Sequence, residues 1–195
     1  MISEKDPDLA SLLSGELSRQ RSTIELIASE NFVPTEILAA MGSIPTNKYA
    51  EGYPGKRYYG GNQYIDDIET LAIGRAKKLF AADHANVQPL SGVPANLAVY
   101  LALLKPGDKI MGMSLASGGH LSHGYKMSVS GKYYKSVSYD VSPETETLDY
   151  DLVLKQAKDE KPNILVCGAS AYPRVIDFCA SQKSRKKWAH IAWQT

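Results

Sequence analysis

The chain has 195 residues, of which 44% are hydrophobic and 22% charged, and its formal net charge is +1 at pH 7. This length suits one domain with its own core, and the near-neutral charge gives no electrostatic reason to expect nucleic acid as the main partner. No apolar run reaches the roughly 18 residues that a membrane helix needs, and the first residues lack the basic and apolar parts of a signal peptide. Two cysteines are too few for a disulfide framework. We therefore expect a cytoplasmic protein with no membrane association.

The first forty residues predict two helices. Asp6 can cap a helix and Pro7 suits its first turn, so we expect a helix over Pro7–Arg19. A second helix should begin at Pro34 and end at Gly42. The first helix carries leucines at helical spacing, which predicts an apolar stripe that can dock on a partner subunit. These are Leu9, Leu12, Leu13 and Leu17.

A segment rich in tyrosine and glycine follows, and we call Lys48–Gly61 the Tyr/Gly loop. It reads K-Y-A-E-G-Y-P-G-K-R-Y-Y-G-G. Four glycines and Pro54 exclude a regular helix, because they add backbone freedom and remove a donor. Each phenol ring brings a large apolar area and a hydroxyl that needs a partner. The residues alone leave two interpretations open: a loop that lines a polar pocket, or a packed surface loop anchored by its rings.

Beyond this loop, helical patterns alternate with short apolar runs. We expect helices over Tyr64–Phe80, Pro94–Leu104 and Asp149–Lys158. We expect strands over His84–Gln88, Lys109–Met113, Tyr133–Tyr139 and Asn163–Cys167. This alternation predicts an α/β fold whose sheet is mostly parallel. The last residues, 179–195, are basic and have no apolar period, and we interpret them as sequence foreign to the rest of the chain; the alternative is a native basic helix.

Three further blocks join the Tyr/Gly loop in one resemblance. They are I-E-L-I-A-S-E-N at Ile24–Asn31, G-G-H-L-S-H-G at Gly118–Gly124 and C-G-A-S-A-Y-P-R at Cys167–Arg174. Together and in this order, the four blocks closely resemble serine hydroxymethyltransferase, a family that interconverts serine and glycine using pyridoxal phosphate and tetrahydrofolate. The resemblance runs from about Leu9 to Phe178 and corresponds to the amino-terminal half of the family's chain. It implies the large domain of a fold-type-I pyridoxal-phosphate enzyme, incomplete here, with an N-terminal helical arm.

The resemblance implies how the cofactor phosphate is bound. Ser91, Gly92 and Val93 lie between a predicted strand and a predicted helix, where free N–H groups and the helix dipole favour a phosphate. From the residues alone, Ser91 can equally be a simple helix cap. This sequence has Leu90 and Pro94 where the family usually has His and Gln, and Pro94 removes one possible amide donor.

The remaining cofactor and folate contacts also follow from the resemblance. His120 is expected to stack on the cofactor ring, Ser170 to hydrogen-bond its ring oxygen, and Tyr49 to contact its phosphate. A zinc site at His120 and His123 is a weak alternative, because the sequence offers no third ligand nearby; we expect no metal. The folate contacts correspond to Leu115, Gly119, His120 and Leu121. Read without the resemblance, Ser170 is an ordinary turn serine.

Glu51 is the candidate proton shuttle, because moving a hydroxymethyl group requires a proton at the substrate hydroxyl. A carboxyl held among phenols can supply it if burial favours its protonated form. The alternative is a salt bridge from Glu51 to Lys48, Lys56 or Arg57. The resemblance places Tyr59 beside the substrate and Ser29 on its carboxylate. It also implies a homodimer in which Tyr49, Glu51 and Tyr59 reach into the neighbouring subunit's site.

The reaction also needs a lysine that forms a Schiff base with the cofactor and an aspartate facing the pyridine nitrogen. The resemblance places both, with an arginine for the substrate carboxylate, outside the matched blocks, so we expect this chain to be inactive alone. Two other functions stay open: a non-catalytic chain that only associates with full-length subunits, and a related pyridoxal-phosphate threonine aldolase. We expect three regions: an arm with the Tyr/Gly loop at 1–60, a partial cofactor-binding domain at 61–178 and an atypical tail at 179–195.

Overall fold

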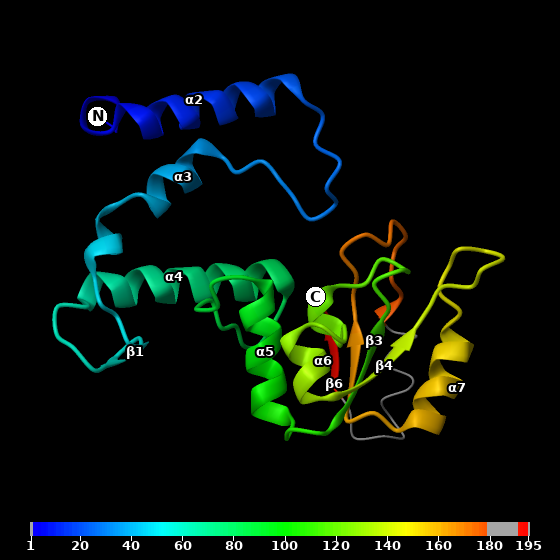
Figure 1. Ribbon diagram of the computed structural model, residues 1–195. Coiled ribbons are helices and arrows are strands. Elements are labelled where there is room, and N and C mark those ends of the chain that lie inside the picture. The colour runs from blue at the N-terminus through cyan, green and yellow to red at the C-terminus, as the bar shows by residue number, and fades with distance from the viewer. Residues whose placement is uncertain (1, 179–190, 195) are drawn as a thin grey trace. The chain divides into compact units, whose positions relative to one another are not determined.

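The structure, a computed structural model, describes residues 2–178 and 191–194 and divides into two compact units, Met1–Phe32 and Val33–Thr195 (Figure 1). The first unit holds helices α1 (Ile2–Lys5) and α2 (Pro7–Ser22). The Asp6 carboxylate accepts a hydrogen bond of 2.9 Å from the Leu9 amide, which confirms Asp6 as the cap of α2. No residue of α2 is buried, and its four leucines are all exposed.

The second unit begins with short elements. Helix α3 (Thr35–Met41) starts after Pro34 and ends at Gly42, as predicted, and the 3-10 helix η1 (Ile44–Asn47) follows. Strands β1 (Gly52–Tyr53) and β2 (Lys56–Arg57) then pair antiparallel inside the Tyr/Gly loop. Helix α4 (Gln63–Phe80) confirms the long helix expected after the loop.

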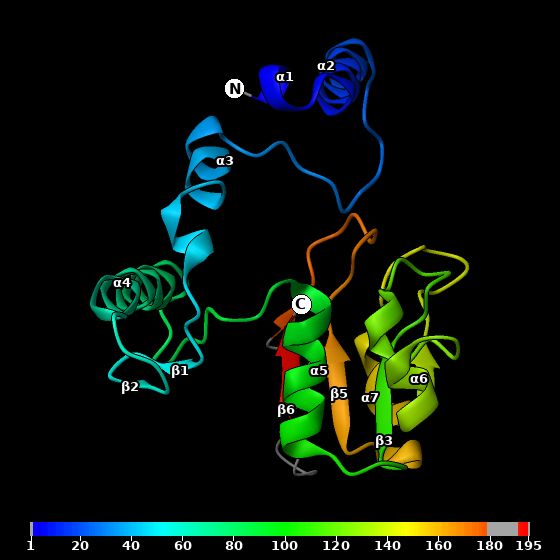
Figure 2. The same ribbon diagram turned by 60° about the vertical axis from the view of Figure 1, so that its left-hand side comes forward.

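The rest of the unit is a parallel sheet with helices on both faces, which confirms the α/β prediction. Its strands lie in the order β4–β3–β5–β6, and Figure 2 shows β3, β5 and β6 side by side. The strands are β3 (Lys109–Met113), β4 (Lys135–Tyr139), β5 (Ile164–Cys167) and β6 (Ile191–Gln194). The helices are α5 (Gly92–Leu103), η2 (Leu121–His123), α6 (Val129–Tyr133) and α7 (Tyr150–Glu160).

Successive residues of β3 and β5 pack into two different cores. Ile110, Ile164 and Val166 are buried with Tyr100 of α5, on one face of the sheet. Their neighbours in sequence face the other way and form a core with Ala157 of α7; these are Met111, Met113, Leu165 and Cys167. A parallel sheet covered on both faces requires such continuous apolar runs, so the same runs that predicted the strands also explain the core.

Two predicted strands need correction. Residues 84–88 form no strand, because side chains rather than a neighbouring strand hold this segment: Nε2 of the Gln88 side chain donates to the Gly52 carbonyl at 2.9 Å. The strand predicted over Tyr133–Tyr139 begins only at Lys135. The residues before it form α6, because the Ser128 hydroxyl caps that helix by accepting from the Gly131 amide.

The prediction for the tail falls mostly outside the described residues. The exception is β6, whose backbone pairs in parallel with β5 from Ile164↔Ile191 to Cys167↔Gln194. Within the described residues, no helix is both long and apolar enough to cross a membrane.

Candidate cofactor and substrate site

The first turn of α5 presents unpaired hydrogen-bond donors. The first helical hydrogen bond runs from the Ala95 amide to the Ser91 carbonyl, at 3.1 Å. Among the described residues, nothing accepts from the amides of Gly92 and Val93, and the Ser91 side chain makes no capping hydrogen bond. A simple cap, the alternative interpretation of Ser91, is therefore not what its side chain does. Ser91, Gly92 and Val93 are all exposed, and a Cβ atom added at Gly92 would meet open space.

The loops that follow β3 and β5 are bound to each other at the carboxyl edge of the sheet. The amides of Ser170 and Ala171 both donate to the Gly118 carbonyl, at 2.9 and 3.0 Å. Gly118 has a φ of +99°, and a Cβ there would lie 2.6 Å from the Tyr172 amide nitrogen. At Gly119 a Cβ would lie 2.1 Å from the Met113 carbonyl oxygen. Both glycines are needed for this close approach, which brings Gly119 and Ser170 together.

His120 stands at the start of η2, next to α5. Its ring is half-buried, and its Nδ1 atom lies 2.8 Å from the Ser122 hydroxyl and 3.1 Å from the Ser122 amide nitrogen. The Asn96 side chain donates to the same hydroxyl at 2.8 Å. Because Asn96 belongs to α5, these contacts join the helix whose first turn offers donors to the loop that carries His120. Leu115 and Leu121, on either side of His120 in sequence, are about half exposed, at 48% and 47%.

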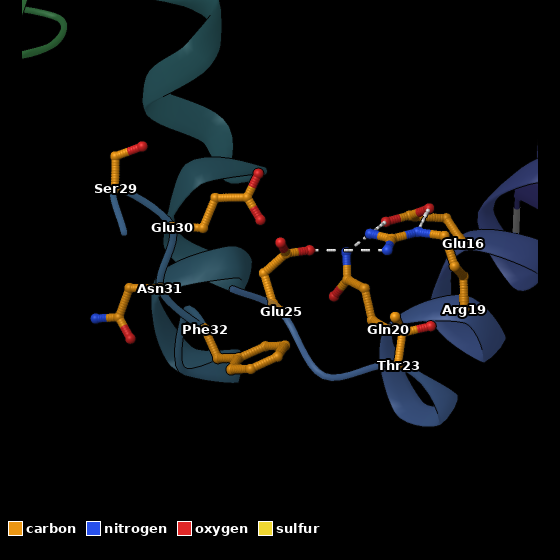
Figure 3. Close-up of a pocket in the computed structure, with 9 residues that line it drawn as sticks. All are labelled: Glu16, Arg19, Gln20, Thr23, Glu25, Ser29, Glu30, Asn31 and Phe32. Carbon is orange, nitrogen blue, oxygen red and sulfur yellow. Dashed lines mark hydrogen bonds and ion pairs between the residues drawn. The ribbon is translucent and has the colours of Figure 1, made fainter. Parts of the chain in front are cut away.

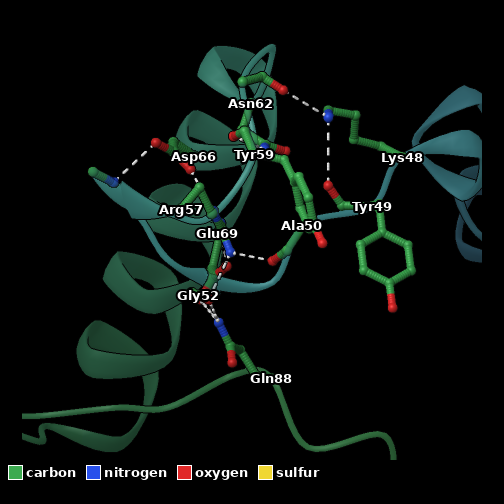
Figure 4. Close-up of polar contacts among 12 residues, drawn as sticks. Lys48, Tyr49, Ala50, Gly52, Arg57, Tyr59, Asn62, Asp66, Glu69 and Gln88 are labelled. Atoms are coloured by element: carbon green, nitrogen blue, oxygen red, sulfur yellow. Dashed lines mark hydrogen bonds and ion pairs between the residues drawn. The ribbon is translucent and has the colours of Figure 1, made fainter.

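The Tyr/Gly loop is held by the Arg57 side chain, which is only 5% exposed (Figure 4). Its guanidinium pairs with Asp66 at 2.7 Å and with Glu69 at 2.6 Å, both on α4. It also donates to the carbonyl oxygens of Ala50 and Gly52, each at 2.8 Å. The Gly55 amide and then the Arg57 guanidinium lower the pKa of Asp66. The Asp66 carboxylate thus remains an ionised partner of the arginine.

This network leaves Glu51 outside. Arg57, one of the three cations considered for a salt bridge with Glu51, is fully used by α4 and by backbone carbonyls. Among the described residues no ion pair reaches Glu51, and its side chain is exposed. The rings of Tyr49 and Tyr59 meet edge to face at 5.6 Å, and both are more than half exposed. Within this chain the loop therefore presents Glu51 and two phenols to its surroundings; burial of Glu51 is not found.

Ser29 lies in the other unit, in a pocket of about 500 Å³ (Figure 3). Arg19 is placed between two carboxylates there, 2.8 Å from Glu16 and 3.8 Å from Glu25. Hydrogen bonds from Arg19 and then Gln20 lower the pKa of Glu16 to about 2. Partial desolvation, followed by the charge of Glu25, raises the pKa of Glu30. The pocket is lined by Glu16, Arg19, Gln20, Thr23, Glu25, Ser29, Glu30, Asn31 and Phe32.

Comparison with known proteins shows to which family the chain belongs. The family model of serine hydroxymethyltransferase matches residues 2–190. The chain belongs to the serine hydroxymethyltransferase family. It is 62% identical over 177 residues to the serine hydroxymethyltransferase of Crocosphaera subtropica and 63% identical over 175 residues to that of Oenococcus oeni. These matches cover 91% and 90% of this chain but 42% of each relative, so the chain spans less than half the length of these proteins.

Some matches extend into the predicted foreign tail. The family model ends at residue 190, and the match to the serine hydroxymethyltransferase of Kocuria rhizophila, at 55% identity, covers 98% of this chain and 46% of the relative. The foreign origin of residues 179–195 stays a prediction.

The structure brings together only part of the site predicted from the family. Hydrogen bonds connect the loop of His120 both to α5 and to the Ser170 loop, at the carboxyl edge of the sheet, where open α/β sheets bind ligands. Tyr49, Glu51 and Tyr59 share a separate loop, and Ser29 lies in the other unit. Among the described residues, no group of three or more His, Cys, Asp or Glu side chains could hold a metal ion.

Sequence reasoning missed Asn96, Ser122 and Arg57. Asn96 is the one strongly polar side chain in the apolar helix α5, and a buried amide in such a helix needs a partner, so it could have been noticed. Arg57 had a similar indication, because acidic residues at 66 and 69 lie three apart on one face of the next helix. Ser122 offered no such indication beyond its place between two histidines.

Proposed function

We propose that this chain supplies part of a pyridoxal-phosphate site for the interconversion of serine and glycine with tetrahydrofolate. The observation that carries the proposal is that hydrogen bonds connect the loop of His120 to α5, through Asn96 and Ser122, and to the Ser170 loop, through Gly118. Family membership supports the same reaction, because the relatives are named serine hydroxymethyltransferases. The α/β unit would then be part of a fold-type-I large domain.

The chemistry of the first turn of α5 fits a phosphate group. Two backbone amides without partners, at Gly92 and Val93, lie at the positive end of a helix of 12 residues, and the Ser91 hydroxyl stands next to them. Amides at a helix start bind anions through direct hydrogen bonds and through the helix dipole. Pro94 has no N–H, so the turn offers one donor fewer than it could. We therefore assign the cofactor phosphate to Ser91, Gly92 and Val93.

The ring of the cofactor would lie between the loops that follow β3 and β5. His120 can stack on one face, excluding water from it, and the Ser170 hydroxyl can donate to the ring oxygen. When bound there, pyridoxal phosphate supplies an electron sink for the bonds broken at the substrate's α-carbon. The Schiff-base lysine is expected outside the matched blocks. Leu115, Gly119 and Leu121, beside His120 in sequence, would provide an apolar and close-packed surface for the folate.

Glu51 would hold and move the proton at the substrate hydroxyl. A general acid must lie within hydrogen-bond reach of its proton and hold it near the working pH. This chain leaves Glu51 exposed, so its burial would come from the subunit into whose site the loop reaches. Tyr49 and Tyr59 would enter with it, on the phosphate and substrate sides respectively, and Ser29 would bind the substrate carboxylate.

The proposed homodimer has support from α2. Its four leucines are between 43% and 72% exposed, and the helix buries no residue in this chain. A stripe of this kind is seldom left in water by a stable protein. A second subunit would cover it and would receive the Tyr/Gly loop.

The proposed reaction is tested by a chimera in which residues 1–178 replace the matching part of the Oenococcus oeni relative. We expect the chimera to release glycine from serine only when tetrahydrofolate and pyridoxal phosphate are both present. The unaltered relative is the positive control. This chain alone, mixed with the same reagents, shows whether residues 1–195 are sufficient to release glycine from serine. A folded chimera that binds pyridoxal phosphate but splits serine equally well without folate would contradict the proposed reaction.

A further inference from the structure

A buried polar cluster joins α5 to the loop that carries His120. Asn96 and Ser122 are each 4% exposed, and His123 is 3% exposed. Buried polar groups are costly unless their hydrogen bonds are made, so such a cluster fixes the side chains it contains. The proposed function gives none of these three residues a role. Together they affect the protonation and the orientation of the His120 ring.

The Nδ1 atom of His120 faces two hydrogen-bond donors. The Ser122 amide, which can only donate, lies 3.1 Å from Nδ1. A neutral imidazole has one protonated nitrogen and one acceptor, so an acceptor at Nδ1 requires the proton on Nε2. Among the contacts of the described residues, Nε2 of His120 has none.

The Ser122 hydroxyl reinforces this arrangement. It accepts from the Asn96 side chain at 2.8 Å, so its single proton is available for Nδ1 of His120, 2.8 Å away. The Ser122 carbonyl is also bound, because the Tyr100 hydroxyl donates to it at 2.9 Å. Both the side chain and the backbone of Ser122 are therefore anchored to α5.

His123 holds the other end of the cluster. Its Nδ1 atom accepts from the His120 amide at 3.4 Å, which closes a reciprocal cap around η2. Burial, followed by the electrostatic effect of the neighbouring His120, lowers the pKa of His123 to about 4. The ring is thus neutral near pH 7 and can act as an acceptor.

We propose that Asn96 and Ser122 are positioning residues that hold His120 as the Nε2–H tautomer and in a single ring orientation. This inference deepens the proposed function and rests on it only for the identity of the ligand that His120 would stack on. The helix that offers donors to a phosphate and the imidazole that would stack on the cofactor ring are then connected by one hydrogen-bonded path. Loss of the Ser122 hydroxyl should loosen the His120 ring, which would then be held by the Ser122 amide alone, and should leave the phosphate donors in place.

The test is ¹⁵N NMR of the chain labelled at histidine, without added cofactor. Each of the four histidines is assigned by its own His→Gln substitution. We expect His120 to give the separate nitrogen shifts of a fixed Nε2–H tautomer, while exposed His84 gives the averaged shifts of a mixture. Ser122→Ala keeps the amide donor to Nδ1 but removes the hydroxyl, so it should move the shifts of His120 part of the way toward those of His84. Ser122→Thr, which keeps the hydroxyl, should restore them. A mixture at His120 in the unmodified chain overturns the inference without any variant, and so do unchanged shifts in Ser122→Ala.

A second readout separates this inference from the proposed function. Pyridoxal phosphate affinity, measured by calorimetry, should fall several-fold in Ser122→Ala and return in Ser122→Thr. A fixed tautomer in a chain that binds no pyridoxal phosphate would leave the positioning role standing and contradict the proposed function. Tight cofactor binding to a chain whose His120 is a tautomeric mixture would support the proposed function and contradict the positioning role.

Discussion

The rings of Tyr49 and Tyr59 meet edge to face, with centroids 5.6 Å apart and an angle of 78° between their planes. The two residues flank the β1–β2 hairpin, so their contact closes the base of the segment that carries Glu51. Arg57 holds the same segment from inside by binding the carbonyls on both sides of Glu51, those of Ala50 and Gly52. Glu51 therefore projects from a loop whose backbone is fixed, and this geometry leads to the first two predictions.

In the chimera described above, Glu51→Gln should lower serine–glycine turnover by about 10²-fold or more, the scale of a lost general acid–base group. The affinity for pyridoxal phosphate should barely change, because the phosphate donors lie on α5. Turnover and calorimetric titration are measured on the same sample, with the exposed Glu144→Gln as the matched control. Near-normal turnover in Glu51→Gln would remove Glu51 from the mechanism.

Arg57→Lys should loosen the Tyr/Gly loop, because an ammonium group cannot bind two carboxylates and two carbonyls in the geometry of a guanidinium. We expect faster hydrogen exchange of the amides in residues 50–58 and a lower melting temperature. Arg75→Lys is the matched control, since Arg75 is an exposed arginine of α4. Equal exchange rates in the two variants would mean that Arg57 does not fix the loop.

Burial of His123 predicts a stability that depends on pH. Its pKa falls from 6.5 to about 4 on folding, so between these values the unfolded chain binds more protons and the free energy of unfolding rises with pH. The contribution is complete above pH 6.5 and is lost as the pH falls toward 4, by about 3 kcal/mol over the whole window.

Urea unfolding at about pH 7.5 and about pH 5.5 measures this effect, and we expect the free energy of unfolding to drop by roughly 1 kcal/mol between them. His123→Gln should flatten this dependence. His84→Gln, at an exposed site, should leave it as it is. If the slope persists in His123→Gln, another group causes it.

The leucines of α2 should make the chain self-associate. Leu13→Glu places a charge in the exposed apolar stripe and should shift the chain toward monomer in light scattering. Ser11→Glu adds the same charge on the other side of the helix and should have no such effect. Equal light-scattering masses for the two variants would show that the leucine stripe of α2 does not form the subunit contact.

The sequence predicts those helices and strands that are marked by residues of the same segment, such as a capping side chain or an apolar run. Asp6 and Asp149 cap α2 and α7 through their carboxylates, and the apolar runs of β3 and β5 have no other place than a covered sheet. Residues 84–88 have the composition of a strand but no neighbouring strand to pair with, and composition does not reveal a missing partner. Helix α6 begins at the Ser128 cap, just before β4. The aromatic and β-branched residues that follow favour a strand, so the sequence pattern did not predict this short helix.

The same division holds for the site. Family motifs predict residues that would contact the ligands, such as Ser91, His120 and Ser170. The contacts that orient them join distant segments: Asn96 reaches Ser122, and Arg57 reaches Glu69. Such pairs depend on how α5 and α4 pack, and no spacing within the sequence encodes that packing.

The most direct test of the account concerns the phosphate donors of α5. Val93→Pro removes one amide, and proline is tolerated in the first turn of a helix, whereas Pro94→Ala adds an amide to the same turn. Pyridoxal phosphate is titrated into the unmodified chain and both variants by calorimetry, with inorganic phosphate as a competitor. A hydrogen bond to a charged group contributes about 1.5–3 kcal/mol, so we expect Val93→Pro to weaken binding by about tenfold or more and Pro94→Ala to strengthen it. Equal affinities in all three chains would show that the start of α5 is not the phosphate site and would contradict the assignment of the cofactor to this edge of the sheet.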